Sequence, residues 1–137
     1  MSIAIVAGNW KMNTTITDAR ALVNAMKEGL DAVEGVTKGV CPPFVSLSAV
    51  AEMLRGSSVH VGAQNMHHEE KGAYTGEVSP AMLAGICRYV VLGHSERRLH
   101  FGETDAGVSL KAGAAIEAGL RPIVCVGESL HDREQGS

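Results

Sequence analysis

Five short apolar runs, each followed by a polar loop and a helical pattern, constrain the fold of this chain more than any other feature. The runs are rich in Val and Ile and mostly do not alternate with polar residues, which is typical of strands buried on both faces. They lie at Ile3–Gly8, Gly39–Pro42, Val59–Ala63, Arg88–Gly93 and Arg121–Gly127. Strand and helix repeat at a spacing of about 30 residues, the size of one βαβ unit. The sequence therefore predicts a parallel α/β sheet.

Helical patterns fill the intervals between these runs. Apolar residues recur at i, i+3 and i+4 spacing, and residues that commonly cap helices stand at the ends of the patterns. The predicted helices run from a Thr17 cap to Leu30, from Leu47 to a stop at Gly56, from a Ser79 cap with Pro80 behind it, and from Thr104 to Gly119.

No linker or low-complexity segment interrupts the pattern, so we expect residues 1–137 to form a single domain. Only "ESLHDREQGS" (Glu128–Ser137) follows the fifth run, which leaves room for a loop and the start of a helix. We interpret this ending as a truncated repeat. The opening "MSIAIVAGNW" has neither a basic region nor a small-residue cleavage site, so a signal peptide is not expected.

Charge and cysteine content narrow the classes of partner. Charged residues make up 20% of the chain and the formal net charge is −3, which favours neither nucleic acid nor a membrane surface as partner. No apolar run is long enough to span a bilayer. Cys41, Cys87 and Cys125 are odd in number and far apart. This pattern predicts free thiols in a reducing cytosol rather than disulfides.

Polar residues follow the predicted strands at their carboxyl ends, where parallel α/β proteins bind ligands. Lys11 could hold an anion by its charge, and His94 could act as an acid, a base or a polarising donor. Asn9 could donate to a carbonyl oxygen or to an oxyanion. Taken singly, Lys11 could equally be solvated and His94 could simply cap the helix behind it. Three such groups together favour a site that polarises a carbonyl beside an anionic group.

Other motifs favour less specific interpretations. The stretch "HHEE" (His67–Glu70) contains metal-ligating residue types, but adjacent loop residues rarely converge on one ion, so a solvated loop is favoured. Ser95 has no G-x-S-x-G sequence around it, which argues against a hydrolase. Neither a G-x-G-x-x-G loop nor a Walker lysine motif occurs, so nucleotide binding lacks its usual loop.

Several motifs together resemble the triosephosphate isomerase family, in that family's order and spacing. They are "AGNWKMN" (Ala7–Asn13), "AQN" (Ala63–Asn65), "GAYTGE" (Gly72–Glu77), "VVLGHSERR" (Val90–Arg98) and "CVGE" (Cys125–Glu128). The resemblance implies an eightfold (β/α) barrel of about 250 residues, of which this chain supplies the first five βα units as an incomplete barrel. It also implies interconversion of dihydroxyacetone phosphate and glyceraldehyde 3-phosphate, in glycolysis and gluconeogenesis in the cytoplasm, without cofactor or metal.

The resemblance assigns roles to four residues. Asn9 would help to polarise the substrate oxygen, and Lys11 would stabilise the negative charge of the substrate and of the enediolate. His94 would be the electrophile that shuttles a proton between the two substrate oxygens, with Glu96 as a supporting charge. This family is a standard case of a catalytic histidine kept neutral by a helix N-terminus. In this chain the helix would begin at Ser95.

The resemblance also implies a homodimer, because "GAYTGE" is similar to a loop that enters the partner subunit in that family. Thr75 would be inserted near the partner's active-site asparagine and lysine, with Tyr74 and Asn65 also at the dimer interface. From the residues alone, the same stretch would be a glycine-flanked surface loop. Arg97 and Arg98 are expected to form ion pairs that are structural or that contact a second subunit, and Glu103 is a candidate partner.

One catalytic group of the family has no counterpart in this sequence. The family's general base is a glutamate on a "YEPVWAIGTG"-like segment after the sixth strand, and no such segment occurs here. We therefore expect the chain to be inactive by itself. The alternatives are a non-enzymatic barrel fragment that self-associates or pairs with a complementary fragment, and, more remotely, a different phosphosugar barrel enzyme.

Overall fold

The computed structural model describes residues 2–136 and contains one five-stranded parallel sheet, in which each strand pairs with the next one along the chain. The parallel α/β sheet predicted from the sequence is therefore confirmed. The strands are β1 (Ile5–Asn9), β2 (Thr37–Cys41), β3 (Val59–Ala63), β4 (Tyr89–Leu92) and β5 (Arg121–Val124).

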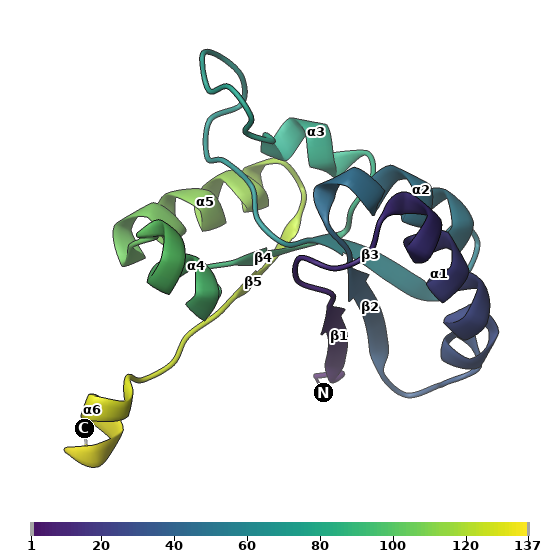
Figure 1. Cartoon of the computed structure of the whole chain (residues 1–137), viewed down its shortest axis with the longest axis horizontal. Helices are drawn as coiled ribbons and strands as arrows, with labels where there is room; N and C mark the ends of the chain where they lie inside the picture. Colours follow the sequence, from purple (N-terminus) through teal and green to yellow (C-terminus); the bar gives the residue numbers. More distant parts are fainter. Residues whose placement is uncertain (1, 137) are drawn as a thin grey trace.

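Helices cover one face of the sheet, and the opposite face lies open (Figure 1). Helices α1 and α2 pack beside β3, while α5 packs on β4 and β5. The short α6 lies apart from the other helices at the end of an extended segment (Figure 1). The helices are α1 (Ile16–Asp31), α2 (Phe44–Leu54), α3 (Pro80–Ala84), α4 (Ser95–Phe101), α5 (Asp105–Glu117) and α6 (Leu130–Glu134).

The first helix begins earlier than predicted. Its N-cap is Thr15, and Thr17 lies inside the helix, so the predicted cap is wrong. The Thr15 hydroxyl accepts the Asp18 N–H, and the Asp18 carboxylate accepts the Thr15 N–H, each at 3.2 Å. This reciprocal capping box satisfies two donors that a helix start otherwise leaves open. The predicted caps Ser79 and Thr104 are confirmed.

The hydrophobic core lies between the helices and the outer face of the sheet. Successive residues of a strand point to opposite faces, so alternate residues of the inner strands β2, β3 and β4 enter this core. The strand contributions are Val40, Val59, Val61, Ala63, Val90 and Leu92, and the helices add Ala19, Val23, Leu47, Val50, Leu54, Leu83, Val108 and Ala115. The alternate residues of these strands therefore point toward the opposite face of the sheet, which no helix covers and which is called the inner face below.

Gly62 lies at a crowded position on the inner face of the sheet, the face that no helix covers. A Cβ on Gly62 would lie 2.8 Å from the Cys41 sulfur and 3.3 Å from the Cβ of Tyr89, so no larger residue fits there without movement. Cys41 and Tyr89 are both buried although no helix covers this face. The curvature of the sheet brings the carboxyl ends of β1 and β4 toward one another.

The cysteines are free thiols, as predicted. Burial raises the pKa of Cys41 to about 11 and the pKa of Cys87 to about 12. Burial also raises the pKa of Cys125. All three are therefore protonated and weakly nucleophilic near neutral pH.

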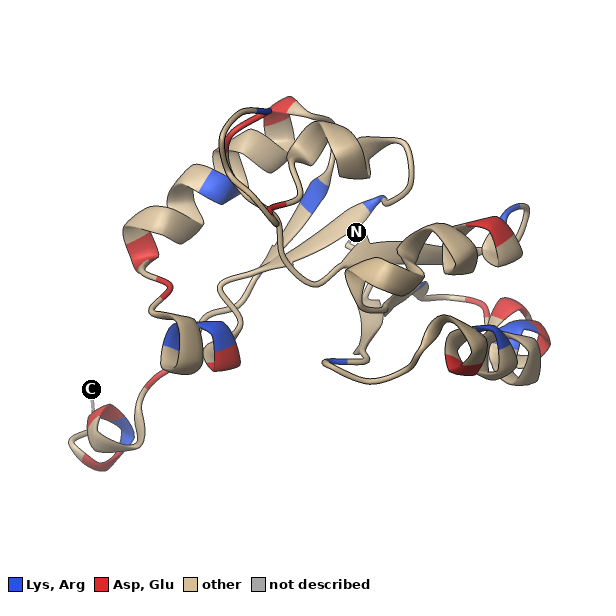
Figure 2. Ribbon diagram, turned by 45° about the horizontal axis from the view of Figure 1, so that its top comes forward, with Lys and Arg blue, Asp and Glu red and all other residues tan. Residues whose placement is uncertain are grey.

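Charged residues are concentrated on helices and loops (Figure 2). The described strands carry no Asp or Glu, and their formal charges are Lys38 and Arg121. Within residues 2–136, no helix is both long enough and apolar enough to cross a membrane.

The two edge strands, β1 and β5, each have a neighbour on one side only. Apolar residues on and beside them are exposed, including Ile5, Val6, Val124 and Val126, the last at 90%. Unpaired strand edges and exposed apolar side chains are the usual features of a surface that another chain or segment covers.

Candidate active site

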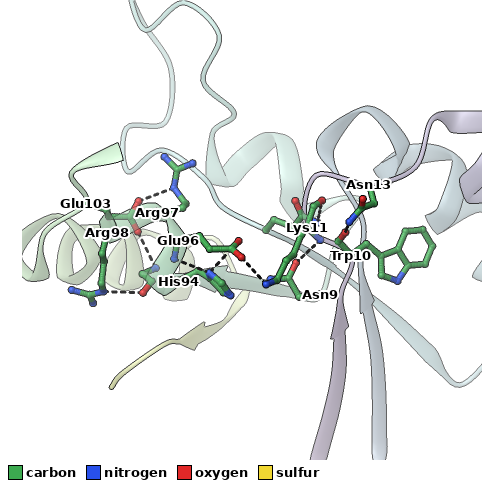
Figure 3. Close-up of polar contacts among 11 residues, drawn as sticks. Asn9, Trp10, Lys11, Asn13, His94, Glu96, Arg97, Arg98 and Glu103 are labelled. Atoms are coloured by element: carbon green, nitrogen blue, oxygen red, sulfur yellow. Dashed lines mark hydrogen bonds and ion pairs between the residues drawn. The ribbon is translucent and has the colours of Figure 1, made fainter. Parts of the chain in front are cut away.

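The loops that follow β1 and β4 meet at the carboxyl end of the sheet. The Lys11 ammonium lies 2.6 Å from the Glu96 carboxylate, and Glu96 is the second residue of α4. Figure 3 shows this ion pair joining Lys11, on the loop after β1, to Glu96 and His94 beyond β4. Two polar segments that are far apart in the sequence therefore form one cluster.

Lys11 adopts a backbone conformation that is unusual for a residue with a side chain. Its φ is 56°, in the left-handed region, which costs about 1–2 kcal/mol for such a residue. Its N–H donates to the Asn9 side-chain oxygen at 2.9 Å, and the Gln64 amide donates to its carbonyl at 2.8 Å. The same Gln64 nitrogen also donates to the Cys41 carbonyl, which ties the loop to β2. Strained residues held this way cluster at functional sites.

His94 caps α4 with its own side chain. Its Nδ1 accepts the backbone N–H of Glu96 at 3.1 Å. A ring nitrogen that accepts a hydrogen bond carries no proton, so this contact favours a neutral imidazole with its proton on Nε2. The side chain is 23% exposed, so the ring is reachable from solvent. The structure is therefore compatible with both sequence interpretations of His94, since the residue caps α4 and also lies in the polar cluster.

Glu96 supplies the negative charge of the cluster. One of its oxygens pairs with Lys11, and the other lies 3.7 Å from Nδ1 of His94. The hydrogen bond from Lys11 holds the pKa of the Glu96 carboxyl below its ordinary value. Glu96 is therefore ionised near neutral pH, and its charge offsets that of Lys11.

A buried ionic network lies behind the cluster. Glu103, whose side chain is 5% exposed, accepts from the Gly93 N–H, from Arg97 and from Lys111, each at 2.9 Å. Burial alone would raise the pKa of the Glu103 carboxyl, but the hydrogen bonds from Lys111 and Arg97 outweigh it and keep the pKa below its ordinary value. The predicted pairing with Glu103 is confirmed for Arg97, whereas Arg98 forms its ion pair with Asp105 instead.

The residues expected at a dimer interface are in different environments. Asn65 is buried, and its side-chain oxygen accepts from Lys111 at 2.9 Å within this chain. Tyr74 and Thr75 are exposed on the loop between β3 and α3, which projects from the rest of the fold in Figure 1. Of the three residues, these two offer accessible side chains to a partner.

The histidines of the "HHEE" stretch lie together on the same loop. The His67 and His68 rings are 4.5 Å apart, and His68 lies 3.6 Å from the Glu69 carboxylate. In the part of the chain that the structure describes, no three His, Cys, Asp or Glu side chains are grouped so that they could hold a metal ion.

Comparison with known proteins decides the family. The family model described as triosephosphate isomerase matches residues 4–137. The chain belongs to the triosephosphate isomerase family. It is 60% identical over 130 residues to a triosephosphate isomerase of Dehalococcoides mccartyi, covering 95% of this chain and 52% of that protein. It is 53% identical over 137 residues to one from Chloroflexus aurantiacus, covering 99% and 55%.

A solved structure of a triosephosphate isomerase has the same fold as this chain. The crystal structure of the Bartonella henselae triosephosphate isomerase superposes with a TM-score of 0.92 at 37% identity, covering 98% of this chain and 56% of that chain. The chain thus spans about half the length of the relatives it matches. Its five strands correspond to the first five βα units of the family's barrel, so the predicted fold class is confirmed.

Sequence reasoning missed two features of the site. Gln64 lies in the "AQN" stretch, to which no role at the site was assigned beyond Asn65, and the left-handed conformation of Lys11 was not predicted. Both depend on how closely the loops after β1, β2 and β3 approach one another, and no local motif reports that distance. The amide of Gln64 at a strand end was the only available signal.

Proposed function

We propose that this chain forms the electrophilic part of a triosephosphate isomerase site, which interconverts dihydroxyacetone phosphate and glyceraldehyde 3-phosphate through an enediolate. The observation that carries the proposal is the cluster of Lys11, Glu96 and His94 at the carboxyl end of the sheet. The family's name supports the reaction and a phosphorylated triose as the substrate.

His94 acts as the proton shuttle in this proposal. With Nδ1 accepting from Glu96, the Nε2–H is available to donate to a substrate oxygen. A neutral imidazole is a weak acid that is well matched to a weakly acidic enediol, so it can give a proton to one oxygen and take a proton from the other.

Lys11 and Asn9 stabilise charge in the same proposal. The Lys11 ammonium attracts the anionic substrate and the enediolate. Asn9 uses its side-chain oxygen to accept from Lys11, which leaves the amide nitrogen as the end that can donate to the substrate. Glu96 holds the ammonium in place by its ion pair.

The general base does not come from the carboxylates beside His94. Abstraction of a carbon-bound proton needs an available carboxylate, whereas Glu96 is paired with Lys11, and Glu103 is buried among Gly93, Arg97 and Lys111. We infer that the base belongs to the remaining barrel units of the family and that this chain has no isomerase activity by itself. The proposed chemistry uses side chains and substrate, without cofactor or metal ion.

The proposal extends to assembly and location. The projecting loop that carries Tyr74 and Thr75 supports a homodimer of the complete protein, because it offers exposed side chains away from the sheet. The single sheet supports one domain over residues 1–137. We place the protein in the cytoplasm, acting on a small phosphorylated sugar in glycolysis and gluconeogenesis, with neither nucleic acid nor membrane as partner.

The decisive experiment supplies the barrel units that lie beyond the part of the relatives that this chain matches. This chain is fused to the carboxyl-terminal part of the Dehalococcoides mccartyi relative, the part beyond the matched segment, and isomerase activity is assayed. We expect activity in the fusion protein and none in the chain by itself.

Replacing His94 by Gln in the fusion protein is expected to lower kcat by about 10²–10⁴-fold, the usual contribution of general acid–base catalysis. Replacing Arg55 by Met, which breaks an exposed ion pair with Glu52, is the control.

A non-enzymatic module is the second candidate, and the open inner face with its exposed edge strands is the observation that favours it. Such a fragment would self-associate or pair with a complementary fragment. A fusion protein that folds but shows no isomerase activity would support this candidate over the enzyme.

A further inference from the structure

Gly93, the residue before His94, has its backbone fixed by two charged side chains. Its N–H donates to the Glu103 carboxylate at 2.9 Å, and its carbonyl accepts from Nε of Arg98 at 2.8 Å. Figure 3 shows Arg98 and Glu103 on the same side of the cluster as His94. Hydrogen bonds with an ionised partner are about twice as strong as neutral ones. The N–H and the carbonyl of Gly93 are thus both hydrogen-bonded to charged side chains.

The position also requires glycine. The φ of Gly93 is 69°, in the left-handed region. A Cβ there would lie 2.9 Å from an Arg98 nitrogen and 2.9 Å from a Val108 methyl carbon. The same Arg98 side chain therefore holds the carbonyl of Gly93 and packs against its Cα.

The two charged side chains are themselves anchored in the helices that follow. Glu103 is also bound by Arg97 on α4 and by Lys111 on α5. Arg98 also forms an ion pair with Asp105, the first residue of α5. The two side chains that bind Gly93 are therefore themselves held by ion pairs with residues of α4 and α5.

We propose that Arg98 and Glu103 are positioning residues that clamp Gly93 and so fix the direction in which His94 leaves the turn. The inference rests on the proposed role of His94. A peptide unit is planar, so holding the Gly93 carbonyl also fixes the plane that contains the nitrogen and Cα of His94. Holding the Gly93 N–H fixes the preceding plane. The two planes meet at the Gly93 Cα, so both dihedral angles of the most flexible residue type are set.

The clamp matters because a proton shuttle must keep its ring within hydrogen-bond reach of two substrate oxygens. The Nδ1 contact with Glu96 orients the ring, but it does not determine where the His94 Cα lies. A displacement of about 1 Å in a reacting group can cost about 10²-fold in rate. Glycine without external restraints would permit such a displacement.

The test uses the fusion protein described above, with Arg98 replaced by Met. This variant loses the donor to the Gly93 carbonyl, and we expect kcat to fall by about 10²-fold with KM nearly unchanged, because the shuttle acts in the transition state. Arg98→Lys, which retains a cationic donor, is expected to recover part of the loss. Asp105→Asn is the matched control, because it removes the other partner of the same guanidinium and leaves the bond to Gly93. Because Asp105 only anchors the far end of the Arg98 side chain, the kcat of Asp105→Asn should stay much closer to that of the parent than the kcat of Arg98→Met.

A spectroscopic readout separates positioning from general stability. In the ¹⁵N spectrum of labelled histidine, we expect the parent to show His94 with a protonated Nε2 and an unprotonated Nδ1, and Arg98→Met to show a broadened or mixed signal. Amide exchange at Gly93 should accelerate when Glu103 is replaced by Ala. The proposal is overturned if folded Arg98→Met keeps the parent kcat and His94 spectrum, or if Asp105→Asn loses as much activity.

Two further outcomes remain informative. If Arg98→Met does not fold, Arg98→Lys decides. The proposed need for the Arg98 guanidinium is contradicted if the Lys variant folds, keeps the parent kcat, and shows the same Gly93 amide exchange and His94 spectrum as the parent. If the parent fusion protein folds but is inactive, the proposed function fails, and the Gly93 exchange and His94 spectrum of the variants still test the clamp.

Discussion

At the scale of single residues, the candidate site depends on charges that are neutralised in pairs. Lys11 is matched by Glu96 at the surface, and Glu103 is matched by Arg97 and Lys111 below it. An exposed pair contributes little to stability, whereas removing one member of a buried pair leaves the other charge unsatisfied. Glu103 is therefore the residue in this region whose charge matters most for folding.

Glu103 should make the folded chain sensitive to acid. Its pKa is below the ordinary value of 4.5 in the folded state, so its contribution is fully present above pH 4.5 and is lost as the pH falls through the folded-state pKa. We expect Glu103→Gln to lower the free energy of unfolding by about 2 kcal/mol near neutral pH and to flatten its decline in acid. Urea unfolding followed by circular dichroism at a series of pH values measures both effects.

The matched control for this prediction is Glu52→Gln, which removes an exposed carboxylate paired with Arg55. Its stability should change by less than about 1 kcal/mol at any pH. Equal acid sensitivity of the parent and Glu103→Gln would show that the buried carboxylate is not the group responsible.

The residue types of the site were predictable, but their restraints were not. Asn9, Lys11 and His94 were identified because polar residues directly follow strands, and that pattern is local. The left-handed backbone of Lys11 and its bond from Gln64 depend on three strands meeting, which no local pattern encodes.

At the scale of the elements, sequence patterns located the five described strands and the starts of α3 and α5, because burial periodicity and capping residues are local signals. The apolar spacing from Leu47 missed the beginning of α2, which starts at Phe44. The N-terminus of α1 was misplaced, since Thr15 and Thr17 are equally good caps and the choice is made by Asp18. A capping box, with its reciprocal acidic partner, was the signal that distinguished the two threonines.

The inner face of the sheet leads to a prediction about Gly62. Adding a methyl group there forces contact with the Cys41 sulfur and the Tyr89 Cβ, so we expect Gly62→Ala to destabilise the chain by about 1–3 kcal/mol. Gly113→Ala is the control, because Gly113 lies in α5 with open space around it and should gain about 1 kcal/mol in helix propensity. Urea midpoints that shift in the same direction for both variants would contradict this account.

At the scale of the whole molecule, the outstanding feature is an open sheet. The apolar periodicity predicted strands and helices but could not show which strands would lack a second neighbour, because that depends on the order in which they pair. The structure places β1 and β5 at the edges and leaves the inner face uncovered. About half of the length of the family relatives is not matched by this chain.

The chain by itself should therefore associate with other copies. We expect sedimentation velocity to show a mean mass that rises with concentration, because unpaired edges and exposed apolar side chains favour contact between copies. Adding the carboxyl-terminal part of the Dehalococcoides mccartyi relative should replace these species by a single complex that contains the two parts in equal numbers. A monomer whose mass is independent of concentration would rule out this behaviour.

The strand order has a consequence for how the protein is made. Each strand after β1 pairs with the one synthesised just before it, so each pairing closes a loop of modest length. Contacts between nearby segments form faster than contacts between distant ones. As the chain leaves the ribosome, β2 can pair with β1, β3 with β2, and so on without waiting for later segments. The sheet can thus be assembled strand by strand during translation.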